Sequence, residues 1–190
     1  MKKAQVMVII SLVIVTLSCK AQQIIPVEKM IEYRDSDAQI PEGAYLKDIN
    51  GLLDKYLGTW KGTTNNKNYT FIITKAKQKL VSISADELFI HYLITTTTGS
   101  IVEDTRSLPD TNPLVIEGDY ISKSKGYYTL NYFGKNSTCG ESGVVFISTT
   151  KDNRQMKLLL SPDQGFLDRN KCSKIAEQIL PTTSMFLTKQ

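Results

Sequence analysis

The side chains of this sequence that could act as acids, bases or nucleophiles form no recognisable catalytic set. His91 is the only histidine, and a general base must lie within hydrogen-bond reach of the group that it deprotonates. The sequence offers His91 no such nucleophile, which favours a satisfied structural position in a strand. Ser122 and Lys125 have the Ser-x-x-Lys spacing that places a lysine one helical turn from a serine nucleophile. This run leads into Gly126 at the end of a predicted strand, where the helical geometry fails.

Cysteines and carboxylates also predict no chemistry. The run Cys139-Gly140-Glu141-Ser142-Gly143 lacks the spacing and the following helix of a nucleophile elbow, so we predict a loop. Adjacent carboxylates occur at Asp86-Glu87 and Glu103-Asp104. Because neighbours on a strand point to opposite faces, we expect both pairs to solvate turns. Cysteines and one histidine without short ligand spacing make no zinc site. We therefore expect a protein that is not an enzyme, with no catalytic residue, no metal and no cofactor.

The N-terminus has the pattern of a secretory signal. Lys2 and Lys3 precede a mostly apolar run over residues 6–17, and small residues follow it. The run is too short to cross a bilayer, because a spanning helix needs about 20 apolar residues. We therefore expect residues 1–18 to be a signal peptide and the protein to be exported.

The signal peptide has two possible cleavage sites, and they differ in whether the mature protein is anchored to the membrane. Leu17-Ser18-Cys19 resembles the lipobox of bacterial lipoproteins, which implies cleavage before Cys19 and lipid attachment to its thiol. More than one acyl chain makes such an anchor stable. The alternative is cleavage after Ala21, which leaves a soluble N-terminus. We favour the anchor. Because residues 20–23 lack the acidic residues that resemble a surface-export tag, we expect outer-membrane attachment facing the periplasm.

The two downstream cysteines and the charge distribution agree with an exported protein. If Cys19 is lipidated or removed, Cys139 and Cys172 remain as an even pair in an oxidising compartment, so we predict a disulfide between them. Two unrelated thiols are the alternative. The formal net charge is +4 and the basic residues are scattered, which excludes the electrostatic footprint of a nucleic-acid-binding protein.

The mature chain is predicted to be an arm followed by one domain. Residues 19–45 hold the lipid-attachment cysteine and then Pro26, Pro41 and mixed charge without a sustained period, which is typical of a linker or arm. Apolar residues from Ile49 to Leu57 have helical spacing, with Asp48 as the N-cap. We therefore expect one short helix at the start of a domain that covers residues 46–190.

The rest of this domain is strand-like. A meander of about eight to ten strands with no intervening helix must bury its apolar face by closing into a barrel or by folding into a sandwich. We predict an all-β fold, an antiparallel up-and-down β-barrel. Gly and Asn between the strands indicate tight turns, because both tolerate positive φ. Apolar and polar residues alternate over residues 69–74, 81–85, 88–95, 115–121, 127–133, 144–149, 155–160 and 185–188.

A motif that follows the predicted helix carries a family resemblance. Tyr56-Leu57-Gly58-Thr59-Trp60-Lys61-Gly62 resembles the Gly-x-Trp signature that opens the first strand of lipocalins. The resemblance implies that Gly58 and Trp60 are structural, that the Trp closes the barrel base, and that a late basic residue packs over it. The sequence identifies no such basic residue. Together with residues 40–48 and the C-terminal Leu187-Thr188-Lys189-Gln190, the motif also resembles a family of small Bacteroidota lipoproteins. That likeness implies a fold and a location, and no activity.

The aromatic residues of the strands leave two functions open. Tyr92, Tyr128 and Tyr132 could line a hollow barrel and contact a small hydrophobic ligand. The protein would then be a non-enzymatic lipoprotein of the cell envelope that binds this ligand. Alternatively, the same residues are the core of a packed barrel, and the protein is an envelope protein-protein interaction or inhibitor module. Besides this possible ligand, the sequence predicts the membrane as a partner, through the N-terminal lipid anchor. It identifies no protein partner.

Overall fold

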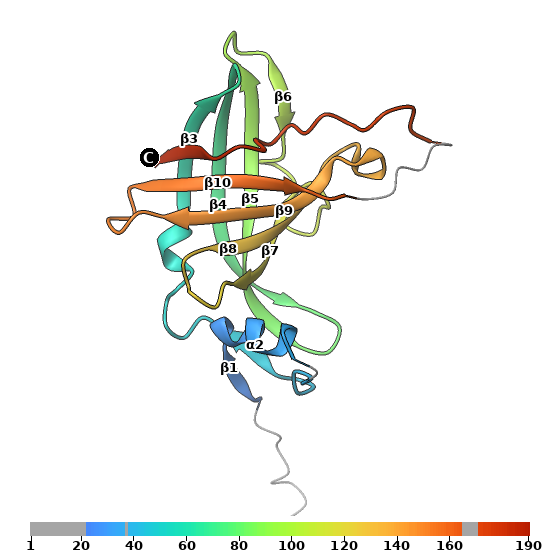
Figure 1. Cartoon of the computed structure of the whole chain (residues 1–190). Helices are drawn as coiled ribbons and strands as arrows, with labels where there is room; N and C mark the ends of the chain where they lie inside the picture. Colours follow the sequence, from blue (N-terminus) through green and yellow to red (C-terminus); the bar gives the residue numbers. More distant parts are fainter. Residues whose placement is uncertain (1–21, 37, 165–170) are drawn as a thin grey trace, which may run out of the picture.

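Eight antiparallel strands close into a barrel in the computed structural model, which describes residues 22–36, 38–164 and 171–190. Each barrel strand pairs with the next one along the chain, and the last returns to pair with the first. Figure 1 shows this arrangement, which confirms the predicted antiparallel up-and-down β-barrel. The barrel strands are β3 (Gly58–Thr64), β4 (Lys67–Lys79), β5 (Ser84–Thr96), β7 (Ile116–Ile121), β8 (Tyr128–Phe133), β9 (Ser142–Thr149), β10 (Gln155–Pro162) and β11 (Met185–Lys189).

Alternation along the strands builds the core inside the barrel. On β4, for example, the side chains of Tyr69, Phe71 and Ile73 are buried, whereas the residues between them are only partly covered. Successive side chains of a strand point to opposite faces, so every second residue faces the interior. The inward residues of all eight strands join in one hydrophobic cluster.

The hairpin turns use residues that tolerate a left-handed backbone. Asn65 and Asn66 connect β3 to β4 with φ angles of 49° and 57°, which suits a two-residue turn. Lys125 and Asn153 also have positive φ in the β7–β8 and β9–β10 connections. The segments that were predicted to be turns therefore do form the hairpin connections between these strands.

One predicted strand is wrong. Residues 81–85 were expected to form a strand separate from residues 88–95, but β5 is a single strand that begins at Ser84. Val81 lies at the tip of the β4–β5 hairpin and is fully exposed. The reason is pairing: β4 continues to Lys79, which lies opposite Ser84, so the chain must turn between them.

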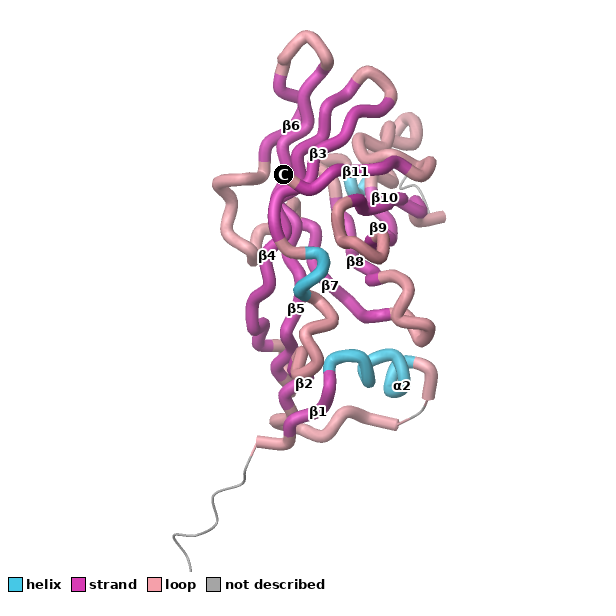
Figure 2. Tube along the Cα trace, turned by 90° about the vertical axis from the view of Figure 1, so that its left-hand side faces the viewer, coloured by secondary structure: helices cyan, strands magenta, loops and turns pink. Residues whose placement is uncertain are grey.

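The N-terminal segment folds against the barrel. It forms β1 (Ile24–Pro26), the 3₁₀ turn η1 (Val27–Lys29), helix α2 (Met30–Arg34) and β2 (Tyr45–Lys47). β1 pairs with β2, and β2 with the start of β5, both in parallel. Figure 2 shows α2 beside these short strands. From Ile24 onward the stretch expected as a linker or arm is an ordered arm, because Ile25 and Leu46 bury their side chains in a small second core.

The short helix lies in this arm and not where helical spacing placed it. Between Asp48 and Leu57 the only helical turn is η2 (Asp54–Tyr56). Gly51 has a φ of +62°, which interrupts a right-handed helix. The Asp48 carboxylate accepts hydrogen bonds from the backbone N–H groups of Leu52 and Leu53 at 2.7 and 3.1 Å. Asp48 thus caps a loop and a single turn.

Two further features complete the described chain. β6 (Ile101–Asp104) lies beside β5 outside the closed barrel, and the 3₁₀ turn η3 (Ser137–Cys139) precedes β9. The predicted signal peptide, residues 1–18, and the predicted lipid-attachment residue Cys19 lie outside the described residues.

Candidate functional site

Trp60 closes the base of the barrel. Its side chain is fully buried beneath η2, and its Nε1–H donates to the backbone oxygen of Tyr56 at 2.7 Å. Lys189 on β11 lies opposite Trp60, with its Nζ 5.2 Å from the ring centroid. Gly58 has a φ of +111°, and a Cβ there would lie 3.3 Å from the Lys189 side chain. Gly58 and Trp60 are therefore structural, and Lys189 is the late basic residue that the sequence did not identify.

Two tyrosine hydroxyls near this base are buried without a partner. Among the described residues, neither the Oη of Tyr56 nor that of Tyr128 has a hydrogen-bond partner, and their ring centroids are 6.0 Å apart. Burial raises the pKa of both phenols above the usual range. One carboxylate oxygen of Glu87 is also buried without a partner. Burial, with the charges of Glu117 and Asp119, raises the pKa of Glu87 to about 8.

Two tyrosine–glutamate pairs occupy the opposite end of the barrel. The Tyr92 hydroxyl donates to Glu103 Oε1 at 3.2 Å, and the Tyr132 hydroxyl donates to Glu141 Oε1 at 2.9 Å. All four side chains are buried. Burial and the two carboxylates raise the pKa of both phenols above the usual range, because ionising a phenol beside a negative charge is unfavourable.

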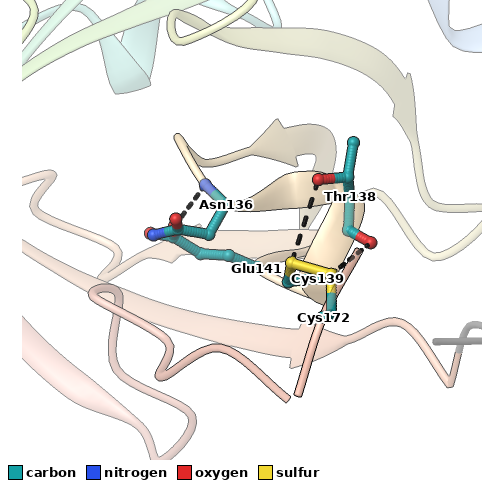
Figure 3. Close-up of a disulfide and its surroundings, with 5 residues drawn as sticks. All are labelled: Asn136, Thr138, Cys139, Glu141 and Cys172. Atoms are coloured by element: carbon teal, nitrogen blue, oxygen red, sulfur yellow. Dashed lines mark hydrogen bonds between the residues drawn. A yellow bond between two sulfur atoms is a disulfide. The ribbon is translucent and has the colours of Figure 1, made fainter. Parts of the chain in front are cut away.

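The remaining oxygens of these glutamates also have partners. Glu141 Oε2 accepts from the backbone N–H and the Nδ2 of Asn136 at 2.8 and 3.0 Å, and Figure 3 shows Asn136 beside Glu141. Lys135 Nζ lies 3.5 Å from Glu103 Oε2. The carboxyls are thus held from several sides. The expectation that Glu103-Asp104 solvates a turn is wrong for Glu103, because its side chain reaches into the barrel, and right only for Asp104, which pairs with Arg106 at the surface.

A disulfide holds the C-terminal strap to this end. We call residues 171–180 the strap. Cys139 and Cys172 form the predicted bond, with their Cα atoms 5.6 Å apart, as Figure 3 shows. The backbone N–H of Ala176 donates to the Cys139 oxygen at 2.8 Å, and the Tyr69 hydroxyl donates to the Ile179 oxygen at 3.1 Å. Because Leu180 is part of the main core, the strap covers the end of the barrel.

The candidate ligand-lining residues are packed. Tyr92, Tyr128 and Tyr132 face the interior, as alternation predicts, and each has 0% of its surface exposed. A side chain beside a hollow wide enough for a water molecule would keep accessible surface. The three side chains keep none, so a ligand could reach them only if the core moved. Three hollows among the described residues lie at the surface, outside this core. One of about 500 Å³ is bounded by the strap and by Lys67 and Val102.

The candidate catalytic groups all have structural partners or neighbours. His91 points away from the interior, and its ring nitrogens lie 3.1 Å from the Thr105 oxygen and 2.8 Å from Asp110 Oδ1. Ser122 and Lys125 belong to the β7–β8 turn, where the Ser122 hydroxyl accepts from the Tyr127 N–H. Lys125 instead lies 3.9 Å from Glu28. The structure therefore does not bring the Ser-x-x-Lys pair into a helical arrangement.

Aromatic side chains at four positions point out of the barrel. We call Tyr127, Phe133, Phe146 and Phe186 the outer aromatic face. They lie on or beside β8, β9 and β11, and the rings of Tyr127 and Phe146 meet edge to face at 5.5 Å. Half or more of Phe133 and Phe186 is exposed. Exposed aromatic side chains are enriched at interaction surfaces.

Within the described ranges, no three His, Cys, Asp or Glu side chains are grouped so that they could hold a metal ion. In the part of the chain that the structure describes, no helix is both long and apolar enough to cross a membrane.

Sequence reasoning missed the burial of three glutamates, Glu87, Glu103 and Glu141. Glu103 is buried on β6, although Ile101, two residues before it, is exposed. Glu141 lies in the loop that precedes β9 and is 1% exposed. No local pattern marks either Glu103 or Glu141, because the burial of Glu103 depends on contact with Tyr92 on β5 and that of Glu141 on contact with Tyr132 on β8.

The fold and the base define the class of protein: a closed, eight-stranded antiparallel barrel with a lipocalin-like base, in which Trp60 is buried under η2 and covered by Lys189. The chain belongs to the family described as Family of unknown function (DUF6705), whose model matches residues 1–175. No curated protein and no solved structure matches the chain.

Proposed function

We propose that this chain is a non-enzymatic protein of the bacterial cell envelope, exported and anchored by lipid at Cys19, that uses a packed barrel to present its outer surface to another protein. The observation that carries the proposal is the complete burial of Tyr92, Tyr128 and Tyr132. A barrel whose interior is filled by its own aromatic residues is a rigid scaffold, and its contacts are then made from outside.

The outer aromatic face supports a protein partner. Aromatic residues are enriched at the centres of protein interfaces, where they supply large contact areas. Phe186 is 67% exposed and Phe133 is 50% exposed, so both can be covered without rearrangement of the barrel. Lys157 is the cross-strand partner of Phe186, so a partner at this position would meet an aromatic ring beside a cation.

The export and anchoring part of the proposal is supported by the N-terminal sequence and its resemblance to small Bacteroidota lipoproteins. The disulfide between Cys139 and Cys172 suits an oxidising compartment. A Cys19→Ser variant tests the anchor: it should leave the membrane fraction, where the wild-type chain should be found. A wild-type chain that is already soluble would point to cleavage after Ala21.

A photo-crosslinking residue in the full chain tests the interaction. It replaces Phe186 in one variant and the exposed Thr98, far from the outer aromatic face, in the matched control. We expect one discrete protein adduct from position 186 and none from position 98 in the source cells, and binding of the identified protein to the purified chain. Equal adducts from both positions, or none from either, would contradict the proposal.

A carrier of a small hydrophobic molecule is the second candidate. The hydroxyls of Tyr56 and Tyr128 are buried and have no hydrogen-bond partner within the part of the chain that the structure describes. They favour this candidate, because a ligand with a polar group could bond to them if the core opened. In that case a stoichiometric apolar compound should be found by mass spectrometry of protein purified from membranes. Its absence, with an intact interior, favours the interaction module.

A further inference from the structure

The described residues begin at Gln22, three positions after the proposed anchor Cys19. Gln22 Nε2 donates to the Gly43 oxygen at 3.1 Å, and the Tyr45 N–H donates to the Gln23 oxygen at 2.8 Å. Cys19 precedes Gln22 by three positions, and three residues of extended chain span at most about 10 Å. A lipid on Cys19 would therefore hold this edge of the protein at the membrane surface.

The same edge exposes apolar side chains. We call Ile24, Gly43, Lys79 and Val81 the foot surface. The Gly43 N–H donates to the Ser82 oxygen at 2.7 Å, so the N-terminus and the β4–β5 hairpin tip are joined. Ile24 is 55% exposed and Val81 fully exposed. In Figure 1 β1 lies below the barrel.

The chemistry of this surface fits a lipid headgroup layer. Ile24 and Val81 are aliphatic and protrude, and Lys79 is an exposed cation two residues before Val81. Small apolar groups with a flanking lysine suit the boundary between headgroups and acyl chains, where the lysine can reach a phosphate.

The foot is fixed to the barrel. Arg34 NH1 lies 2.8 Å from both carboxylate oxygens of Asp119 on β7, and its guanidinium lies 4.7 Å from the Tyr120 ring centroid. Lys123 Nζ pairs with Asp35 at 2.6 Å. Val27 is part of the main core. The arm therefore cannot pivot freely, and the orientation of the foot sets that of the barrel.

We infer that the foot surface rests on the headgroups of the membrane that holds the anchor, so that the barrel stands on its foot with the strap and the β5–β6 hairpin directed away. This inference rests on the proposed lipid anchor at Cys19. β5 runs 13 residues from Ser84 to Thr96, so the two ends of the molecule are separated by up to about 40 Å.

Depth-dependent quenching tests the orientation in the lipidated full chain. An environment-sensitive dye is attached at Val81→Cys and, as the matched control, at Thr97→Cys in the β5–β6 connection, with the native disulfide kept oxidised. Both proteins are reconstituted in vesicles of phosphatidylethanolamine and phosphatidylglycerol that contain a headgroup-level quencher. We expect several-fold stronger quenching at position 81, and no difference between the positions in detergent without quencher.

The outcomes separate the two proposals. Equal quenching at both positions in membrane-bound protein, or stronger quenching at position 97, overturns the orientation and leaves the anchor standing. Wild-type protein that is absent from membranes and carries no acyl chain on Cys19 overturns both. Native Trp60 emission in each labelled protein verifies that the fold is intact.

Discussion

Lys189 lies over the indole of Trp60, with its Nζ 5.2 Å from the ring centroid, although 129 positions (189 minus 60) separate them in the sequence. The two residues are direct partners of β11 and β3, the pair that closes the barrel. The contact therefore joins the first and last barrel strands at the point where the base is sealed.

Removing the charge from this contact should weaken the closure. A cation over an aromatic face contributes about 0.5–1 kcal/mol at exposed sites, so Lys189→Met should lower the free energy of unfolding by about that amount. Urea unfolding measures it. Lys61→Met on β3 is the matched control, because Lys61 is exposed and pairs with Thr188. Equal losses in the two variants would show that the ring contact contributes nothing.

Two tyrosine-to-phenylalanine changes should have different effects. The Tyr132 hydroxyl donates to the buried Glu141, whereas that of Tyr128 has no partner among the described residues. Leaving a buried acceptor unsatisfied costs about 1–3 kcal/mol, so Tyr132→Phe should destabilise by about this much. Tyr128→Phe should be neutral or stabilising. A clear loss for Tyr128→Phe would reveal a partner for its hydroxyl, as the carrier hypothesis requires.

Stability should fall as the pH rises through the titration of Glu87. Its pKa is raised from 4.5 to about 8 by burial and by Glu117 and Asp119, so the folded state binds the proton more tightly than the unfolded state. The contribution of the protonated carboxyl is complete below the unfolded pKa and is lost as the pH approaches and passes about 8. Glu87→Gln should remove this slope between about pH 5 and about pH 9. Urea midpoints across that range test it, and identical slopes in both proteins would contradict the assignment.

The disulfide should stabilise the fold through the strap. Cys139 and Cys172 are separated by 33 residues, and a loop of this length corresponds to about 3–4 kcal/mol in the chain-entropy model. A Cys139→Ser/Cys172→Ser double variant should lose about that much and should be cut faster by protease within the strap. Reduced wild type is the control and should behave like the double variant. Unchanged cleavage would show that the strap is held by its hydrogen bonds and Leu180 alone.

The barrel could be predicted from the sequence because strand alternation and turn preferences are local properties of the chain. Alternation in residues 69–74 and 127–133 depends only on which face of one strand is buried, and Asn65 and Asn66 mark a turn by their own backbone preferences. The prediction of a helix over residues 49–57 was wrong, although the apolar residues of this segment are spaced as in a helix. Leu53 and Tyr56 are buried as expected. Gly51, however, adopts a left-handed backbone conformation, so that only the single turn η2 forms.

The chain by itself determined the strand period, the turn residues, the pairing of its downstream cysteines and the Gly-x-Trp motif. Only the tertiary structure decided which distant groups meet: Lys189 over Trp60, Tyr132 on Glu141, and the N-terminal arm against β5 and β7. The physical reason is that periodicity states which residues must be buried, whereas register and closure decide what they are buried against. Those contacts leave Tyr92, Tyr128 and Tyr132 with no exposed surface inside the barrel.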